Sequence, residues 1–282
     1  MHWLIEPLQY GFMRQALIAG LLVGTTCSML GVYVVLRRLA FLGDAVAHTT
    51  LPGLVVAYLN RWNLLLGALV AALVTALGIG CLSRRERLRE DTAIGVLFSG
   101  MFALGIVLIS RTNSYRDFSH ILFGNILGVT TGDLVGILLV GSIVVGTLLV
   151  FHKELVLTSV DPLHAQVIGL SADKIRYLLL VSIAMSVVTA IQAVGVVLTT
   201  ALLVTPAATA SLLTKRLQRM FALAVLFSAI GTVSGLYASF YLGVSSGGAI
   251  VLACTLVFSV VFVVRSLVQQ ASFRSILLGR FW

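Results

Sequence analysis

Two side chains that could bind a divalent cation lie in an apolar stretch of the chain. Asp44 and His48 are four residues apart, so on an α-helix they share one face, with Cβ atoms roughly 5–6 Å apart. A carboxylate oxygen and an imidazole nitrogen suit manganese, iron or zinc better than magnesium or calcium. An ionisable residue inside lipid is costly and normally faces a partner, a cavity or a pathway. Residue type and spacing therefore make this pair a candidate transition-metal site.

Two ligands are too few to hold a transition metal tightly, and two interpretations stay open. A symmetric dimer would bring two copies of the pair to one axis and supply four ligands, with neighbouring threonine hydroxyls and water completing the shell. Alternatively, Asp44 pairs with Arg37 or Arg38, two turns earlier, and His48 hydrogen-bonds a backbone carbonyl. Spacing alone does not separate these interpretations.

The composition indicates an integral membrane protein. Of the 282 residues, 59% are hydrophobic and 10% are charged, whereas soluble domains carry about 25% charged residues. The net charge of +9 comes from basic residues in short loops between apolar runs, where they act as topology signals, so we reject a nucleic-acid-binding role. The chain lacks a GxxxxGK[ST] loop and a soluble region of useful size. We expect a single transmembrane domain over residues 1–282, with no ATPase site of its own.

Apolar runs of spanning length predict an all-α membrane bundle of about nine transmembrane helices. The expected spans are 12–36, 41–60, 64–83, 92–111, 133–151, 175–194, 196–213, 220–242 and 247–265. The turn near Gly195 is poorly marked, so eight spans remain an alternative. Lys and Arg residues are concentrated in alternate loops, which lie on one side of the membrane. Only four basic residues lie on the other side: Arg14, Arg61, Arg111 and Arg116. This bias predicts an N-terminus outside and a C-terminus, with the tail 266–282, in the cytoplasm.

Two prolines and one loop are further candidates. Pro52 lies one turn after His48 and frees a backbone carbonyl, so it can kink the helix or line a path. Pro206 is a second expected kink and candidate gating position. Asp117 and His120, in the outer loop 112–132, could attract cations to an entrance, although an ordinary solvated loop also explains them.

A short helix is expected between the fifth and sixth spans. Asp161 is a good N-cap, Pro162 a good first helical residue and Gly169 a good C-terminal stop. This pattern predicts a two-turn helix outside the membrane. The helix could dock a cytoplasmic partner or simply connect two spans.

The chain resembles the membrane permease subunits of the bacterial ABC importers for manganese, zinc and iron. Five segments carry the resemblance, in the expected order: Gly43–Gly53, Asp91–Gly100, Leu122–Leu127, Asp161–Gly169 and Val204–Ala210. The resemblance implies a bacterial inner-membrane protein that works with a second permease chain, a cytoplasmic ATPase dimer and an extracytoplasmic metal-binding protein. ATP would bind to the ATPase partner, and the transported metal would be the only ligand here, with no permanently bound cofactor.

The same resemblance assigns roles to residues. It makes Asp44 and His48 the intramembrane metal ligands, and it makes 161–169 the coupling helix, with Asp161, Pro162, Ala165 and Gly169 as its matching positions. Manganese is favoured, because the segment 119–125 looks more like the manganese and iron members; zinc and iron(II) remain alternatives.

Two other classes of function use similar residues. A proton-coupled secondary carrier would also need an intramembrane acid and histidine, but would work without an ATPase. An intramembrane metalloenzyme would need a fuller ligand set, and the chain has no HExxH motif.

Overall fold

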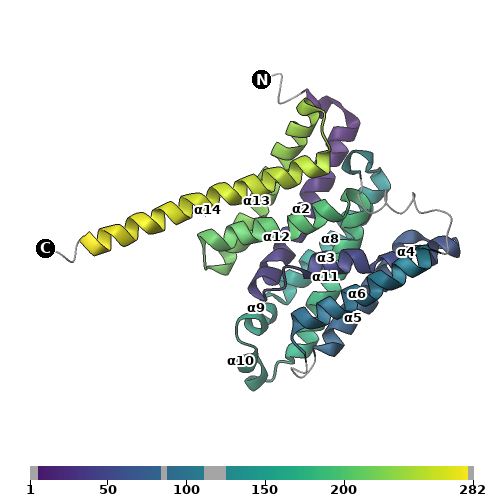
Figure 1. Ribbon diagram of the computed structural model, residues 1–282, viewed down its shortest axis with the longest axis horizontal. Helices are drawn as coiled ribbons and strands as arrows, with labels where there is room; N and C mark the ends of the chain where they lie inside the picture. Colours follow the sequence, from purple (N-terminus) through teal and green to yellow (C-terminus); the bar gives the residue numbers. More distant parts are fainter. Residues whose placement is uncertain (1–5, 84–87, 111–124, 279–282) are drawn as a thin grey trace.

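The computed structural model describes residues 6–83, 88–110 and 125–278, which form helices and no strands (Figure 1). Two short 3₁₀ helices, Pro7–Gln9 and Ile126–Gly128, accompany twelve α-helices. These are α2 (Gly11–Leu36), α3 (Leu42–Thr49), α4 (Leu51–Leu59), α5 (Leu64–Leu82), α6 (Glu90–Ile109), α8 (Thr131–Val150), α9 (His152–Val160), α10 (Pro162–Val167), α11 (Ala172–Val194), α12 (Val196–Leu213), α13 (Leu217–Leu242) and α14 (Ser246–Leu278).

Eight of the described helices are long and apolar enough to cross a membrane, namely α2, α5, α6, α8, α11, α12, α13 and α14. They confirm the predicted membrane bundle and all but one of the expected spans. The poorly marked turn between the sixth and seventh spans is real: Gly195, with φ of 85°, alone separates α11 from α12. A left-handed backbone of this kind is easy for glycine and costly for other residues.

The expected second span, 41–60, is not one helix. It is divided into α3 and α4, which meet at Thr50. The physical reason is Pro52, which has no N–H to donate to the carbonyl of His48. Threonine hydroxyls satisfy nearby carbonyls instead: Thr50 donates to Ala47 at 2.6 Å and Thr49 donates to Val46 at 3.0 Å.

Close backbone contacts through glycine hold the bundle around α3. A Cβ on Gly31 of α2 would overlap the Leu203 carbonyl of α12, and one on Gly43 of α3 would overlap the Leu203 side chain. In the same way, a Cβ on Gly53 of α4 would overlap the carbonyl oxygen of Gly67 in α5, and a Cβ on Gly67 would overlap that of Gly53. Small residues of this kind let membrane helices approach backbone to backbone.

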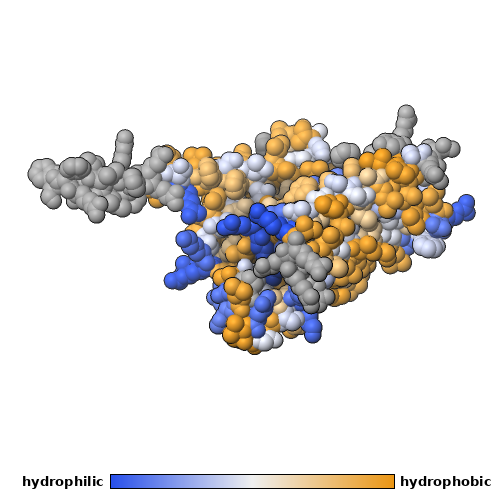
Figure 2. Space-filling model, turned by 60° about the horizontal axis from the view of Figure 1, so that its bottom comes forward, coloured by the Kyte–Doolittle hydropathy of each residue, from blue (hydrophilic) through white to orange (hydrophobic). Residues whose placement is uncertain are grey.

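One large hydrophobic core joins most of the bundle, and α2 and α11 are its most buried spanning helices. Helix α14 extends away from the bundle, and the tail expected from residue 266 continues this helix to Leu278 (Figure 1). In Figure 2, hydrophilic residues gather around the end that carries α9 and α10, whereas apolar residues cover much of the rest of the face in view. This distribution is typical of a protein whose sides face lipid.

Candidate functional site

Helix α3 carries both predicted ligands and lies in the interior of the bundle (Figure 1). It packs against α5, α6, α11 and α12, and its residues Leu42, Ala45 and Val46 are fully buried. Asp44, in the first turn, keeps 38% of its side chain exposed, and His48, in the last turn, keeps 30% exposed. The pair therefore lies on a face of α3 that the described residues leave partly open.

The geometry of the pair fits two ligands of one cation. His48 Nε2 and Asp44 Oδ1 are 3.6 Å apart, too far for a hydrogen bond that would occupy both atoms. Two donors bound to one transition metal at roughly 2.1 Å each, at angles of about 90–110°, stand roughly 3.0–3.4 Å apart. A small movement of either side chain would reach this separation.

The alternative pairing of Asp44 with Arg37 or Arg38 is not found among the described residues, where the ion pair of Asp44 is with His48. The guanidinium of Arg37 donates to Ser159 and Thr158, at 3.0 Å and 3.1 Å. The buried Nδ1 of His48 has no hydrogen-bond partner among the residues that the structure describes. The alternative hydrogen bond from His48 to a backbone carbonyl is therefore not found at Nδ1 in the described part of the chain.

Two aromatic side chains of α6 enclose the imidazole instead. The rings of Phe98 and Phe102 stack at 5.8 Å, and both meet the His48 ring edge-on, at 6.0 Å and 5.5 Å. Phe41 packs edge-on against Phe98. The sequence did not predict this aromatic wall, formed by Phe98 and Phe102 beside His48. The four-residue spacing of Phe98 and Phe102 shows that they share a helix face, but not that this face meets α3.

Within the described ranges, no group of three or more His, Cys, Asp or Glu side chains is placed to hold a metal. Thr49 and Thr50 are buried and donate their hydroxyl hydrogens to carbonyls of α3. One chain thus supplies a carboxylate and an imidazole, and the face that bears them is partly open.

The short helix predicted after residue 160 is present as α10. Asp161 caps it by accepting a hydrogen bond from the His164 N–H at 2.9 Å. Gly169, with φ of 84°, ends it, and the Leu170 N–H donates to the Ala165 carbonyl at 2.9 Å, as in a Schellman motif. Pro162 is its first residue, and the Ala165 side chain is buried.

The other predicted site residues are dispersed. Pro52 lies in the first turn of α4, just after the break at Thr50. Pro206 lies inside α12, which continues through it to Leu213. Asp117 and His120 lie outside the described residues.

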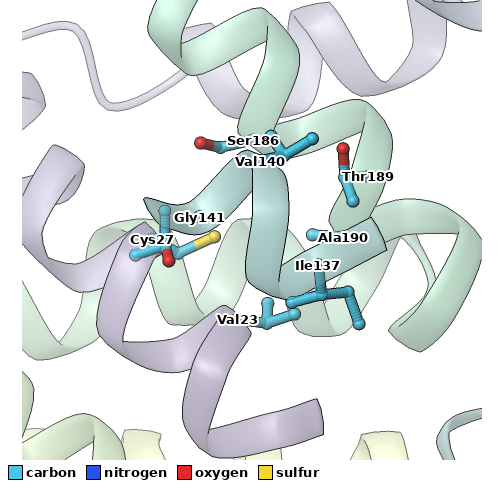
Figure 3. A pocket seen from close by; sticks show the side chains of 9 residues that line it. Val23, Cys27, Ile137, Val140, Gly141, Ser186, Thr189 and Ala190 are labelled. Carbon is cyan, nitrogen blue, oxygen red and sulfur yellow. The ribbon is translucent and has the colours of Figure 1, made fainter. Parts of the chain in front are cut away.

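Two cavities lie away from α3 and neither suits a cation. The larger, of about 920 Å³, opens at the α9–α10 end, and its lining has four arginines, Arg37, Arg38, Arg89 and Arg176, against two carboxylates, Glu90 and Asp173. The smaller, of about 10 Å³, lies between α2, α8 and α11, where Cys27 and the unpaired hydroxyl of Ser186 face mostly apolar side chains (Figure 3). It has room for about one water molecule.

Comparison with known proteins gives a consistent picture. The ABC 3 transport family matches residues 9–265. The manganese transport system membrane protein MntC of Halalkalibacterium halodurans is 43% identical over 258 residues, which cover 91% of this chain and 88% of that protein. The chelated iron transport system membrane protein YfeD of Yersinia pestis is 37% identical over 92% of this chain and 87% of its own length.

A solved structure agrees with the sequence matches. A chain of PsaBC from Streptococcus pneumoniae, in complex with Fab, superposes with a TM-score of 0.80 and is 36% identical, covering 92% of this chain and 94% of that chain. The chain belongs to the ABC 3 transport family, and it is a multi-pass membrane permease subunit.

Proposed function

We propose that this chain is the permease subunit of an ATP-driven importer of divalent transition metals, and that Asp44 and His48 bind the metal during transit. The observation that carries the proposal is the placement of this pair. An acid and an imidazole stand 3.6 Å apart on a helix inside the bundle, on a face that their own chain leaves partly open. Intramembrane ionisable residues with such access are typical of ion pathways.

A second permease chain completes the site. Two copies of the pair at a dimer axis supply two carboxylates and two imidazoles, which is a sufficient ligand set for a transition metal. The aromatic wall of Phe98 and Phe102 limits water beside His48 and keeps the ring at a fixed angle. The pair in one chain is therefore half of the transport site.

Helix α10 docks the cytoplasmic ATPase. Leu163 and Val167, one turn apart, are 72% and 84% exposed, which is unusual for large apolar side chains at a hydrophilic end of a protein. The caps at Asp161 and Gly169 fix this short helix in place. ATP binding and hydrolysis on the partner then change access to Asp44 and His48, after an extracytoplasmic binding protein has delivered the metal. The permease itself carries out no bond chemistry.

Manganese is the favoured metal, with iron(II) and zinc as alternatives. Oxygen and nitrogen ligands accept all three ions. Relatives over most of the chain are named for manganese and for chelated iron, which supports the first two.

Uptake by the reconstituted complex of permease, ATPase and binding protein tests this function. With radioactive manganese, iron and zinc offered separately, we expect ATP-dependent accumulation, with manganese preferred. A proton gradient without ATP should give none. Metal uptake driven by the proton gradient in vesicles that contain the permease alone would instead identify a secondary carrier.

A further inference from the structure

A polar contact between α9 and the end of α2 has no part in the function proposed above. Arg37, the residue after α2, donates from Nε to Ser159 Oγ at 3.0 Å and from Nη2 to Thr158 Oγ1 at 3.1 Å. These hydroxyls in turn donate to the carbonyls of Leu155 and Glu154 within α9, so their oxygens are free to accept. The planar guanidinium thus holds two consecutive residues of α9, which a lysine could not do with one ammonium group.

A second contact joins the same two helices one turn earlier on α2. Tyr33 Oη and His152 Nδ1 are 3.0 Å apart, and Tyr33 is completely buried. The ring of Phe221, from α13, packs against both, at 5.3 Å from the Tyr33 ring and 5.6 Å from the His152 ring. This contact is fixed by packing as well as by the hydrogen bond.

The two contacts hold α9 at both of its ends. Tyr33 lies in the last turn of α2 and Arg37 directly follows that helix, while His152 and Ser159 are two turns apart on the nine-residue α9. Helix α9 is therefore held to α2 along its length and cannot tilt without moving the end of α2. Beyond α9, a single residue, Asp161, leads into α10, which also packs against α9.

On the other side, Arg37 leads directly into the corner before α3. Arg38 has φ of 60°, a left-handed conformation that is strained for a residue with a side chain. The Leu39 N–H donates to the Val34 carbonyl at 2.9 Å, and the Leu42 N–H donates to the Leu39 carbonyl at 2.9 Å. Leu39 and Leu42 are buried. This corner is short and closely hydrogen-bonded, and Asp44 follows it by two residues.

Separating the charged Arg37 side chain from its partners on α9 is also costly. Burial lowers its pKa from the ordinary value, Glu90 acts in the opposite direction, and Arg176 lowers it further. Arginine nevertheless stays protonated at neutral pH. A part-buried guanidinium that lost the two hydroxyls of α9 would lose both of these hydrogen bonds, which favours movement of Arg37 together with α9.

Helix α11 is a second route by which movement of α10 can reach α3, since it contacts both helices. Its first turn, however, is tied to other helices. Arg176 donates to the carbonyls of Gly80 and Ser83 at the end of α5, at 2.9 Å and 3.2 Å, and lies 3.7 Å from Glu90 of α6. A displacement of α11 therefore carries α5 and α6 with it, whereas α9 acts on the corner before α3.

We propose that Arg37 and Tyr33 link α9 to the corner between α2 and α3, so that movement of α10 by the ATPase repositions Asp44 and His48. Both are positioning residues, since neither is a ligand of the metal. The inference rests on the proposed function, in which α10 docks the ATPase and the pair on α3 binds the cargo.

The test uses Arg37→Met in the reconstituted complex, with three measurements: metal uptake, ATP hydrolysis, and manganese binding without nucleotide. We expect uptake to fall at least tenfold, hydrolysis to stay within twofold of wild type, and manganese binding to be unchanged. Arg38→Met removes the neighbouring guanidinium and keeps the contacts to α9, so it should behave as wild type. The double variant Thr158→Val/Ser159→Ala removes the other half of the contact and should match Arg37→Met, including when the two are combined.

Three results would overturn the link. Wild-type uptake by Arg37→Met and by the double variant would show that the contact is not used. Loss of manganese binding would make Arg37 part of the site itself, and loss of hydrolysis in proportion to uptake would assign the contact to ATPase docking. If Arg37→Met does not assemble, the double variant, which removes only hydroxyl contacts, decides the question alone. Failure of the proposed function is distinguishable, because the wild-type complex would then show no ATP-dependent uptake.

Discussion

At the scale of single residues, the environment of His48 determines what the pair on α3 can do. Its Nε2 points toward Asp44, its Nδ1 is buried without a partner in the described structure, and Phe98 and Phe102 hold its ring. Metal-binding histidines usually have the second nitrogen fixed by a carbonyl or carboxylate. Here aromatic packing fixes the ring instead, so its orientation depends on these two rings.

Replacing Phe102 with leucine should weaken metal capture without preventing assembly. One edge-on aromatic contact contributes about 0.5–1.5 kcal/mol, which corresponds to a rise of about 2- to 13-fold in the KM for metal uptake. The maximal rate should change little, because no ligand is removed. Phe262→Leu, at an exposed position of α14, is the matched control. An unchanged KM in Phe102→Leu would show that the ring does not position His48.

At the scale of elements, backbone contacts through glycine place α3. Gly31 lets α2 touch the Leu203 carbonyl of α12, and the side chain of the same leucine packs on Gly43 of α3. Because the helix is broken at Thr50, α4 packs against α5 as an element separate from α3. The site helix is therefore held by its neighbours, and not by its own eight residues alone.

Adding one methyl group at Gly31 should destabilise the fold. The Cβ of Gly31→Ala would overlap a backbone oxygen of α12, and overpacking of this kind costs about 1–3 kcal/mol. Gly136→Ala, on α8, meets no atom within 4 Å and should be neutral or slightly stabilising. Unfolding of the two variants in detergent measures the difference. Equal stability of Gly31→Ala and wild type would contradict the close approach of α2 and α12.

The sequence was sufficient for elements that depend on local chemistry, and insufficient for distant contacts. Asp161 and Gly169 cap α10 as their residue types predict, because capping is local. A kink at Pro52 was one of the two expectations for that residue, but the division of the second span into two helices was not predicted, since proline does not always interrupt a helix: α12 continues through Pro206. The contact of Arg37 with Ser159 joins residues 122 positions apart, and no spacing rule reaches that far.

At the scale of the whole molecule, the crossing of α3 and α4 determines the topology. Eight described helices can span a membrane by themselves. If α3 and α4, 18 residues from Leu42 to Leu59, cross together, they add a path of roughly 27 Å and make the number of crossings odd. The basic residues also favour an odd number, with the N-terminus outside and the C-terminus in the cytoplasm.

Accessibility of the two ends tests this topology. An epitope tag at the N-terminus should be removed by protease added to intact spheroplasts, and one at the C-terminus should be removed only after permeabilisation. Protection of both tags in intact spheroplasts would mean an even number of crossings. In that case α3 and α4 enter and leave the membrane on the same side.

The most direct test of the transport site is manganese binding by the nucleotide-free complex at equilibrium. The wild-type complex should bind one manganese ion per permease dimer, and Asp44→Asn or His48→Gln should abolish that binding while the complex still assembles. Asp133→Asn, which removes a carboxylate at the start of α8, should bind as wild type. Wild-type stoichiometry and affinity in both Asp44→Asn and His48→Gln would contradict the assignment of this pair as the metal site.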